Sequence, residues 1–106
     1  MLTSEEIKRL MQKCIIGVLY SNMDGDDAVD LLGSIIFVLH DSGTITSIQK
    51  EECVFAFFHE YNNGLKEPMS DEYISSTLIP YVLNPKTLDI NLACEFIDRA
   101  STLANI

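Results

Sequence analysis

Apolar residues recur at helical spacing along most of the chain, and this pattern constrains the fold more than any other feature. The clearest case begins at Thr3, which is followed three residues later by Glu6, a pair typical of a capping box at a helix start. The apolar positions that follow are Ile7, Leu10, Met11, Cys14, Ile15, Val18 and Leu19. Their i, i+3, i+4, i+7 spacing predicts an amphipathic helix that buries one face.

The same spacing predicts four more helices, over about residues 26–40, 47–62, 70–82 and 85–104. The second is apolar around most of its circumference, which is typical of a helix at the centre of a bundle. Pro80 lies inside the fourth, so this helix either kinks there or stops near Leu78. Pro85 suits the first position of the fifth helix.

The chain has no sustained strand alternation, no internal repeat and no linker long enough to divide it. With 106 residues it has the length of one ordinary domain. The predicted fold is therefore all-α, a compact bundle of about five helices that forms a single domain over residues 1–106.

Charge is strongly one-sided and unevenly distributed. Sixteen acidic residues oppose seven basic ones, and eight of the acids but only one base, Lys50, lie between residues 14 and 65. Such a surface attracts cationic partners and repels the phosphate backbone of nucleic acid. We therefore expect a basic protein partner and no binding to nucleic acid.

Membrane insertion and secretion are not expected. The longest apolar stretch, Leu31–Leu39, is far shorter than the roughly 20 residues that span a bilayer. Glu5 and Glu6 occupy the place of the basic segment that opens a signal peptide. These features predict a cytoplasmic protein.

The three cysteines are Cys14, Cys53 and Cys94, and no two of them form a C-x-x-C pair. Each falls on an apolar stripe of a predicted helix. Isolated cysteines at such positions are typically small buried side chains in a reducing compartment. We therefore expect all three in the core.

No pattern in the chain predicts a metal, a cofactor or catalysis. The acidic turn 22–27 resembles a calcium loop, but an EF-hand needs glycine at the sixth position and glutamate at the twelfth. Here Gly25 is fourth and Gly33 is twelfth. His40 and His59, the only histidines, lack the spacing of a helical zinc site. The chain is therefore not expected to be an enzyme.

The predicted partner-binding face combines the acids that begin the second helix with those of the third, and adds one aromatic anchor. These residues are Asp24, Asp26, Asp27, Asp30, Glu51, Glu52, Glu60 and Tyr61. Local charge is the reason, because this part of the chain carries most of the net charge of −9. Tyrosine is enriched among the residues that dominate interface energies.

In size, charge and helical content, the chain resembles the bacterial immunity proteins that neutralise nuclease toxins. The resemblance implies an inhibitor of a basic partner, with a nuclease toxin domain as the candidate. A nuclease attracts phosphate with a cationic cleft, which an acidic helical face fits. Two alternatives stay open: a nucleic-acid mimic or phage-type inhibitor of a DNA-binding protein, and a small regulatory or adaptor domain, including a homodimer formed through the second helix.

Overall fold

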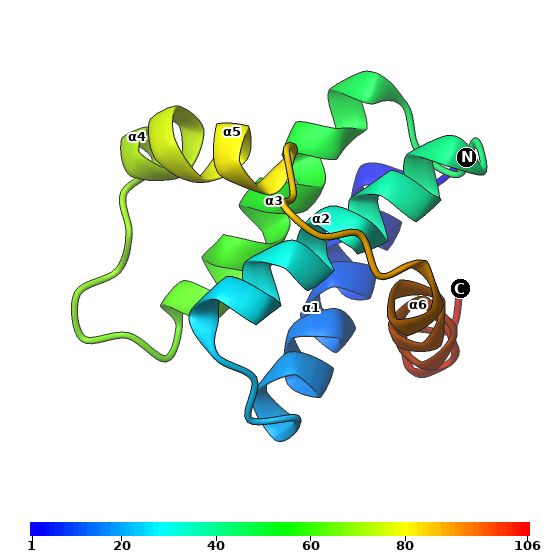
Figure 1. Ribbon diagram of the computed structural model, residues 1–106, viewed down its shortest axis with the longest axis horizontal. Coiled ribbons are helices and arrows are strands. Elements are labelled where there is room, and N and C mark those ends of the chain that lie inside the picture. Colours follow the sequence, from blue (N-terminus) through cyan, green and yellow to red (C-terminus); the bar gives the residue numbers. More distant parts are fainter.

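Helices make up the whole regular structure of the computed structural model, which describes residues 1–106 (Figure 1). The α-helices are α1 (Ser4–Tyr20), α2 (Gly25–Asp41), α3 (Ser47–Asn62), α4 (Asp71–Tyr73), α5 (Ile79–Val82) and α6 (Ile90–Ala104), and a π-helical turn, η1 (Ile74–Leu78), joins α4 to α5. This confirms the predicted all-α class. None of the helices combines the length and the apolar composition that a bilayer span requires.

Side-chain caps define where the long helices begin. Thr3 and Glu6 form the predicted capping box, with the Thr3 hydroxyl accepting from the Glu6 N–H at 3.2 Å and the Glu6 carboxylate accepting from the Thr3 N–H at 2.9 Å. The hydrogen bonds from Thr3 also lower the pKa of Glu6. Thr46 and Gln49 form a second box at the start of α3.

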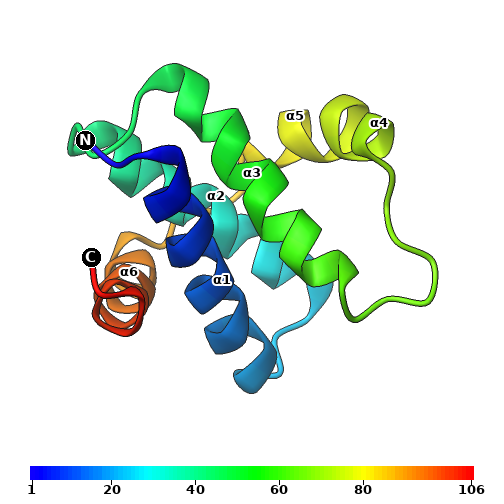
Figure 2. The ribbon, with the colours of Figure 1, turned by 180° about the vertical axis from the view of Figure 1, so that it is seen from behind.

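The helices pack in an arrangement that places α2 at the centre. α1 packs against α3 and α6, and α2 packs against α6, α3 and α5. Seen from behind, α1 and α3 lie in front of α2 (Figure 2). Six consecutive residues of α2, Leu31–Ile36, are all buried, so neighbouring elements cover every side of this helix there. The predicted central position of α2 is therefore confirmed.

The segment around Pro80 stays helical through Val82, so of the two alternatives, a kink at Pro80 or a stop near Leu78, the stop is wrong. The helix widens in η1, where the Ile79 N–H donates to the Ile74 carbonyl five residues earlier. A wider turn relieves the clash that a proline ring makes with the preceding turn of an α-helix. Buried Ile74 and Val82 fix this segment against the core.

The last helix begins at Ile90, and the predicted start at Pro85 is wrong. Pro85 instead lies in the connection 83–89, which crosses α2 at Gly33 (Figure 1). A Cβ atom on Gly33 would lie 2.5 Å from the Val82 carbonyl oxygen and 2.9 Å from the Pro85 Cβ. The absence of a side chain at Gly33 therefore lets this connection pass directly over the centre of α2.

The cysteines divide into two buried residues and one exposed residue. Cys14 and Cys53 lie in the core, where burial raises the pKa of each thiol to about 12. Cys94 is exposed, so the prediction that it is buried is wrong. α6 buries the stripe Ala93, Phe96, Ala100 and Ala104, and Cys94 lies one residue away from that stripe.

Thiol labelling of the native protein should therefore be biphasic. Cys94 is expected to react as fast as a solvent-exposed thiol, whereas Cys14 and Cys53 should react only when the protein unfolds. Mass spectrometry after a short pulse of iodoacetamide would count the modified sites. A Cys94→Ser variant should show no fast labelling, and fast modification of Cys53 in that variant would contradict the burial described here.

Candidate protein-binding site

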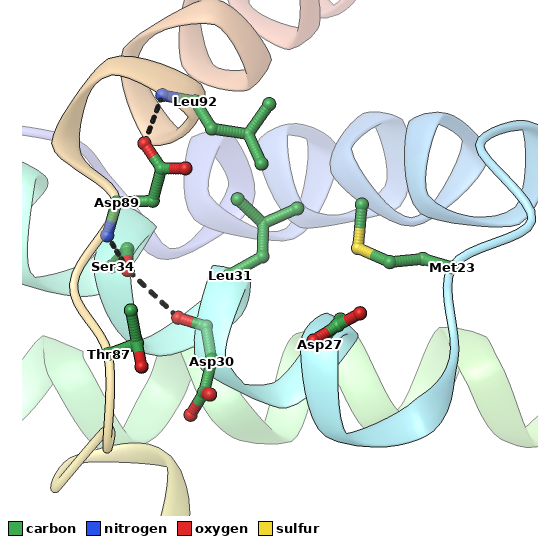
Figure 3. Close-up of a pocket in the computed structure, with 8 residues that line it drawn as sticks. All are labelled: Met23, Asp27, Asp30, Leu31, Ser34, Thr87, Asp89 and Leu92. Atoms are coloured by element: carbon green, nitrogen blue, oxygen red, sulfur yellow. Dashed lines mark hydrogen bonds between the residues drawn. The ribbon is translucent and has the colours of Figure 1, made fainter.

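A cleft with an acidic rim lies between α2 and the segment that leads into α6 (Figure 3). Its volume is about 300 Å³. The lining residues are Met23, Asp27, Asp30, Leu31, Ser34, Thr87, Asp89 and Leu92. No basic side chain lines this site, which we call the acidic cleft. Three carboxylates from two elements therefore surround an opening whose floor is partly apolar.

Hydrogen bonds fix the two walls of the acidic cleft to each other. The Ser34 hydroxyl donates to the Asp30 carbonyl at 2.9 Å and accepts from the Asp89 N–H at 3.1 Å. The Asp30 carboxylate accepts from the Lys86 N–H at 3.3 Å, and the Asp89 carboxylate caps α6 by accepting from the Leu92 N–H at 3.0 Å. Ser34 is fully buried, so the two hydrogen bonds of its hydroxyl are partly shielded from water and join α2 to the start of α6.

The acids that begin α2 differ in what they do for the fold. Asp24 caps the helix, since its carboxylate accepts from the Asp27 N–H at 2.9 Å. The carboxylates of Asp26 and Asp27 accept no hydrogen bond within the protein, and both residues are exposed. Both lie in the first turn, where the helix dipole favours a negative charge. Asp26 and Asp27 therefore present their charges to the solvent and to any partner.

The predicted glutamates lie on a different surface. Glu52 and Glu60 line a groove of about 650 Å³ between α1 and α3, together with Glu5, Lys8 and His59. Basic and acidic side chains both line this groove, so its electrostatic potential has no single sign. The Glu60 carboxylate also accepts hydrogen bonds from neighbouring amide side chains at 3.3 and 3.4 Å.

Glu51 is exposed on α3 and lines neither the groove nor the acidic cleft. Tyr61 lies at the end of α3, where it lines a small apolar pocket with Gly25 and Val29 of α2. Its ring meets the Phe58 ring edge-on, with centroids 6.4 Å apart. The structure therefore places Tyr61 beside the start of α2.

The predicted acids thus do not form one continuous face. Asp27 and Asp30 of α2 line the cleft on the α6 side, whereas Glu52 and Glu60 line the groove beside α1, which lies in front of α2 in the opposite view (Figure 2). Asp89 belongs to the acidic cleft and was not among the predicted residues. Its position directly before the periodic residues of α6 is a helix-cap pattern that the sequence already contained.

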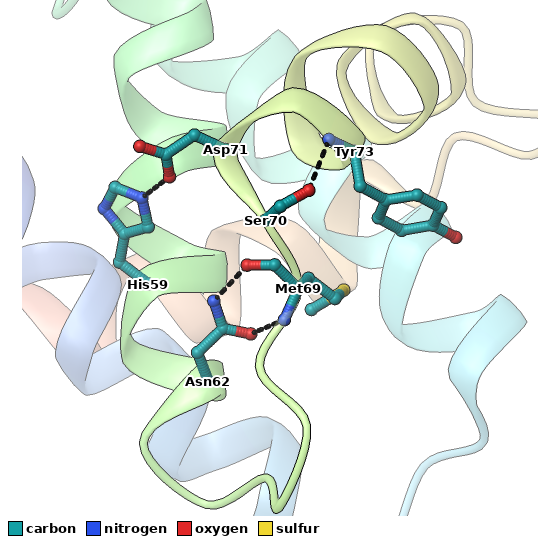
Figure 4. A network of polar contacts seen from close by, with 6 residues as sticks. All are labelled: His59, Asn62, Met69, Ser70, Asp71 and Tyr73. Carbon is teal, nitrogen blue, oxygen red and sulfur yellow. Dashed lines mark hydrogen bonds and ion pairs between the residues drawn. The ribbon is translucent and has the colours of Figure 1, made fainter.

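Almost none of the acidic side chains forms an ion pair within the protein. The one salt bridge joins His59 Nε2 on α3 to Asp71 Oδ1 at the start of α4, at 2.7 Å (Figure 4). Nearby, the Asn62 amide donates to the Met69 carbonyl and accepts from the Met69 N–H, both at 2.9 Å. These contacts close the connection 63–70 and involve only one carboxylate, that of Asp71. The carboxylates of the acidic cleft have no cationic side chain within ion-pair distance.

This arrangement is suited to binding cationic groups of another protein. Carboxylates accept charge-assisted hydrogen bonds from arginine and lysine, which are stronger than neutral ones. No three histidine, cysteine, aspartate or glutamate side chains are placed to hold a metal ion. No protein-family model, curated protein or solved structure matches the chain.

Proposed function

We propose that the protein binds a basic partner protein through the acidic cleft and inhibits it, and that this partner is a nuclease toxin domain. The observation that carries the proposal is the state of Asp26 and Asp27, which are exposed and make no hydrogen bond or ion pair through their carboxylates. Asp27 lines a preformed cleft that has no basic lining side chain, and Asp26 precedes it in the first turn of α2. Charges left unopposed in this way favour a cationic partner.

The acidic cleft matches the chemistry of lysine and arginine side chains. Asp27, Asp30 and Asp89 supply carboxylates around the opening, and the apolar side chains of Leu31 and Leu92 lie between them (Figure 3). A lysine or arginine packs its aliphatic stem on apolar surface while its charged end bonds to oxygen. The cleft therefore offers both surfaces that such a side chain needs.

A nuclease is the favoured partner because its own function requires a cationic cleft. An acidic domain placed over that cleft excludes the phosphate backbone of the substrate, and opposite charges accelerate the encounter. The size, charge and all-α structure that resemble immunity proteins support the same proposal. An inhibitor of this kind acts in the cytoplasm, where its three free thiols stay reduced.

Affinity purification from the native host at low salt tests the proposal directly. A tagged copy of the protein should retain a basic protein that is released as the salt concentration rises, because screening weakens steering and binding by exposed charges. The purified partner should cleave DNA or RNA alone. Its cleavage should stop when this protein is added in equal amount.

A bait carrying Asp26→Lys and Asp27→Lys provides the control, because it inverts the unopposed charges. The proposal is contradicted if both baits retain the same partner equally well, or if the partner is bound without loss of nuclease activity. A retained DNA-binding protein that has no nuclease activity would instead establish the alternative of a nucleic-acid mimic.

A further inference from the structure

A second groove lies between the first and last helices, away from the acidic cleft. Gly17 of α1 faces Phe96 of α6, and Arg9 of α1 donates to the Ala104 carbonyl at 2.9 Å, so the two helices run antiparallel. The groove has a volume of about 290 Å³. A Cβ atom on Gly17 would lie 2.9 Å from the Phe96 ring, so glycine here permits the close approach that forms the floor.

Large apolar side chains remain in solvent along this groove. Tyr20 is 87% exposed and Leu103 is 57% exposed, and Ile16 between them is also exposed. Leu19, next to Tyr20, is 62% exposed. Contiguous apolar exposure of this kind marks interaction surfaces more often than scattered single residues do.

The charge of this groove is opposite to that of the protein as a whole. Lys13 and Arg99 line it, and no acidic residue does. Neither cation forms an ion pair or a side-chain hydrogen bond within the protein. In a chain with only seven basic residues and a net charge of −9, two unopposed cations beside exposed apolar side chains favour an acidic and apolar ligand.

We propose that the groove between α1 and α6 is a second docking surface, which binds an acidic amphipathic helix of another protein. Apolar side chains of that helix pack against Ile16, Tyr20 and Leu103, and its flanking carboxylates pair with Lys13 and Arg99. Helix-in-groove recognition uses this combination of an apolar stripe and flanking charges. The protein would then bind basic and acidic partners on separate surfaces.

Charge disfavours two other occupants of this groove, a second copy of this chain and an anionic membrane. A second copy related by a two-fold axis would place the same patch against itself, so that Lys13 and Arg99 of one copy meet the same cations of the other. An anionic membrane attracts a polybasic segment, with about 1 kcal/mol for each basic residue near its surface. Surfaces that bind anionic lipids in this way typically carry about four to eight basic residues, whereas this groove carries two.

Fluorescence anisotropy with a labelled synthetic helix tests the proposal. The probe carries leucines along one stripe and glutamates on both flanks, and a matched probe carries glutamines in place of the glutamates. The acidic probe is expected to bind the full chain about fivefold more tightly than the neutral probe, a modest factor because exposed ion pairs each contribute little. Lys13→Glu should weaken the binding of the acidic probe by a similar factor. Amide shifts in nuclear magnetic resonance spectra should concentrate in residues 13–20 and 96–103.

Lys66→Glu is the matched control, because it makes the same charge change in the exposed connection 63–70. Equal loss of binding in Lys66→Glu and Lys13→Glu, or equal binding of both probes, overturns the proposal. So does a dimer in sedimentation velocity that Tyr20→Asp converts to a monomer, because a second copy then covers the groove. Binding to phosphatidylcholine–phosphatidylglycerol vesicles that Tyr20→Asp abolishes also overturns it in favour of a membrane surface.

Discussion

Gly33→Ala is expected to destabilise the protein, although alanine in a helix interior normally stabilises it by roughly 0.5–1 kcal/mol relative to glycine. The new methyl group would lie 2.5 Å from the Val82 carbonyl oxygen, a backbone atom that cannot rotate away. Either α2 or the connection 83–89 must shift. Overpacking of this kind lowers the free energy of unfolding by about 1–3 kcal/mol. Urea denaturation would show the loss as a lower midpoint with an unchanged slope.

Gly25→Ala is the matched control for Gly33→Ala, because it makes the same change in the same helix. No atom lies within 4 Å of a Cβ placed on Gly25, which is at the exposed first position of α2. Its unfolding midpoint should stay the same or rise slightly. If Gly33→Ala behaved like Gly25→Ala, the close crossing of residues 83–89 over α2 would be wrong.

Reversing the charges of Asp26 and Asp27 is expected to slow association with a basic partner by about tenfold or more at low salt, where electrostatic steering is strongest. The double variant Asp26→Lys, Asp27→Lys removes two unopposed carboxylates and adds two like charges that repel the partner. Stopped-flow association rates at low and high salt would show a smaller rate and a flatter dependence on salt. Dissociation should change less, because steering acts on the encounter.

The double variant Glu67→Lys, Glu72→Lys controls for net charge. Both glutamates are exposed near α4, away from the acidic cleft, and the change in total charge is identical. If both double variants slow association equally, the acidic cleft has no special role and the effect reflects total charge alone. Circular dichroism should show an unchanged helical content for each variant, because the lost interaction of Asp26 and Asp27 with the helix dipole, about 0.3–1 kcal/mol each, is small compared with the stability of a domain.

The sequence predicted best those helices whose ends are set by local chemistry. α1 begins where the Thr3–Glu6 box indicates, and α3 begins after Thr46, because a cap needs only neighbouring residues. The start of α6 was mispredicted because the path of residues 83–89 depends on contact with Gly33, which is distant in the sequence. Pro85 fits a helix start and a packed connection equally well, and only tertiary contact decides between them.

Cys94 shows a second limit of helical periodicity. The spacing predicts that a helix has an apolar side but not how wide the covered part of that side is. α6 packs small residues, Ala93 and Ala100, against its neighbours, so only a narrow stripe is enclosed. Residues at the edge of the stripe, such as Cys94 and Leu103, are left in solvent.

From the sequence it was possible to name acidic residues as candidates for the site, but not to say which of them share one surface. Local charge alone does not distinguish Asp24 from Asp26 and Asp27. In the structure the Asp24 carboxylate caps α2, whereas the carboxylates of Asp26 and Asp27 accept no hydrogen bond. Asp89 joins them only because α6 starts beside α2, and Glu60 separates from them because it faces α1. These relations depend on packing between helices.

The pairing of the first helix with the last has a consequence for synthesis on the ribosome. α1 leaves the exit tunnel before α6, yet the face that packs around Gly17 stays uncovered until Phe96 emerges. Arg9 likewise cannot make its hydrogen bond to the Ala104 carbonyl until Ala104 has emerged. Contacts between such distant residues require a large loop to close, which slows folding. During translation the nascent chain therefore exposes this apolar part of α1 until α6 has been synthesised, and exposed apolar surface of this kind makes incomplete chains prone to aggregation.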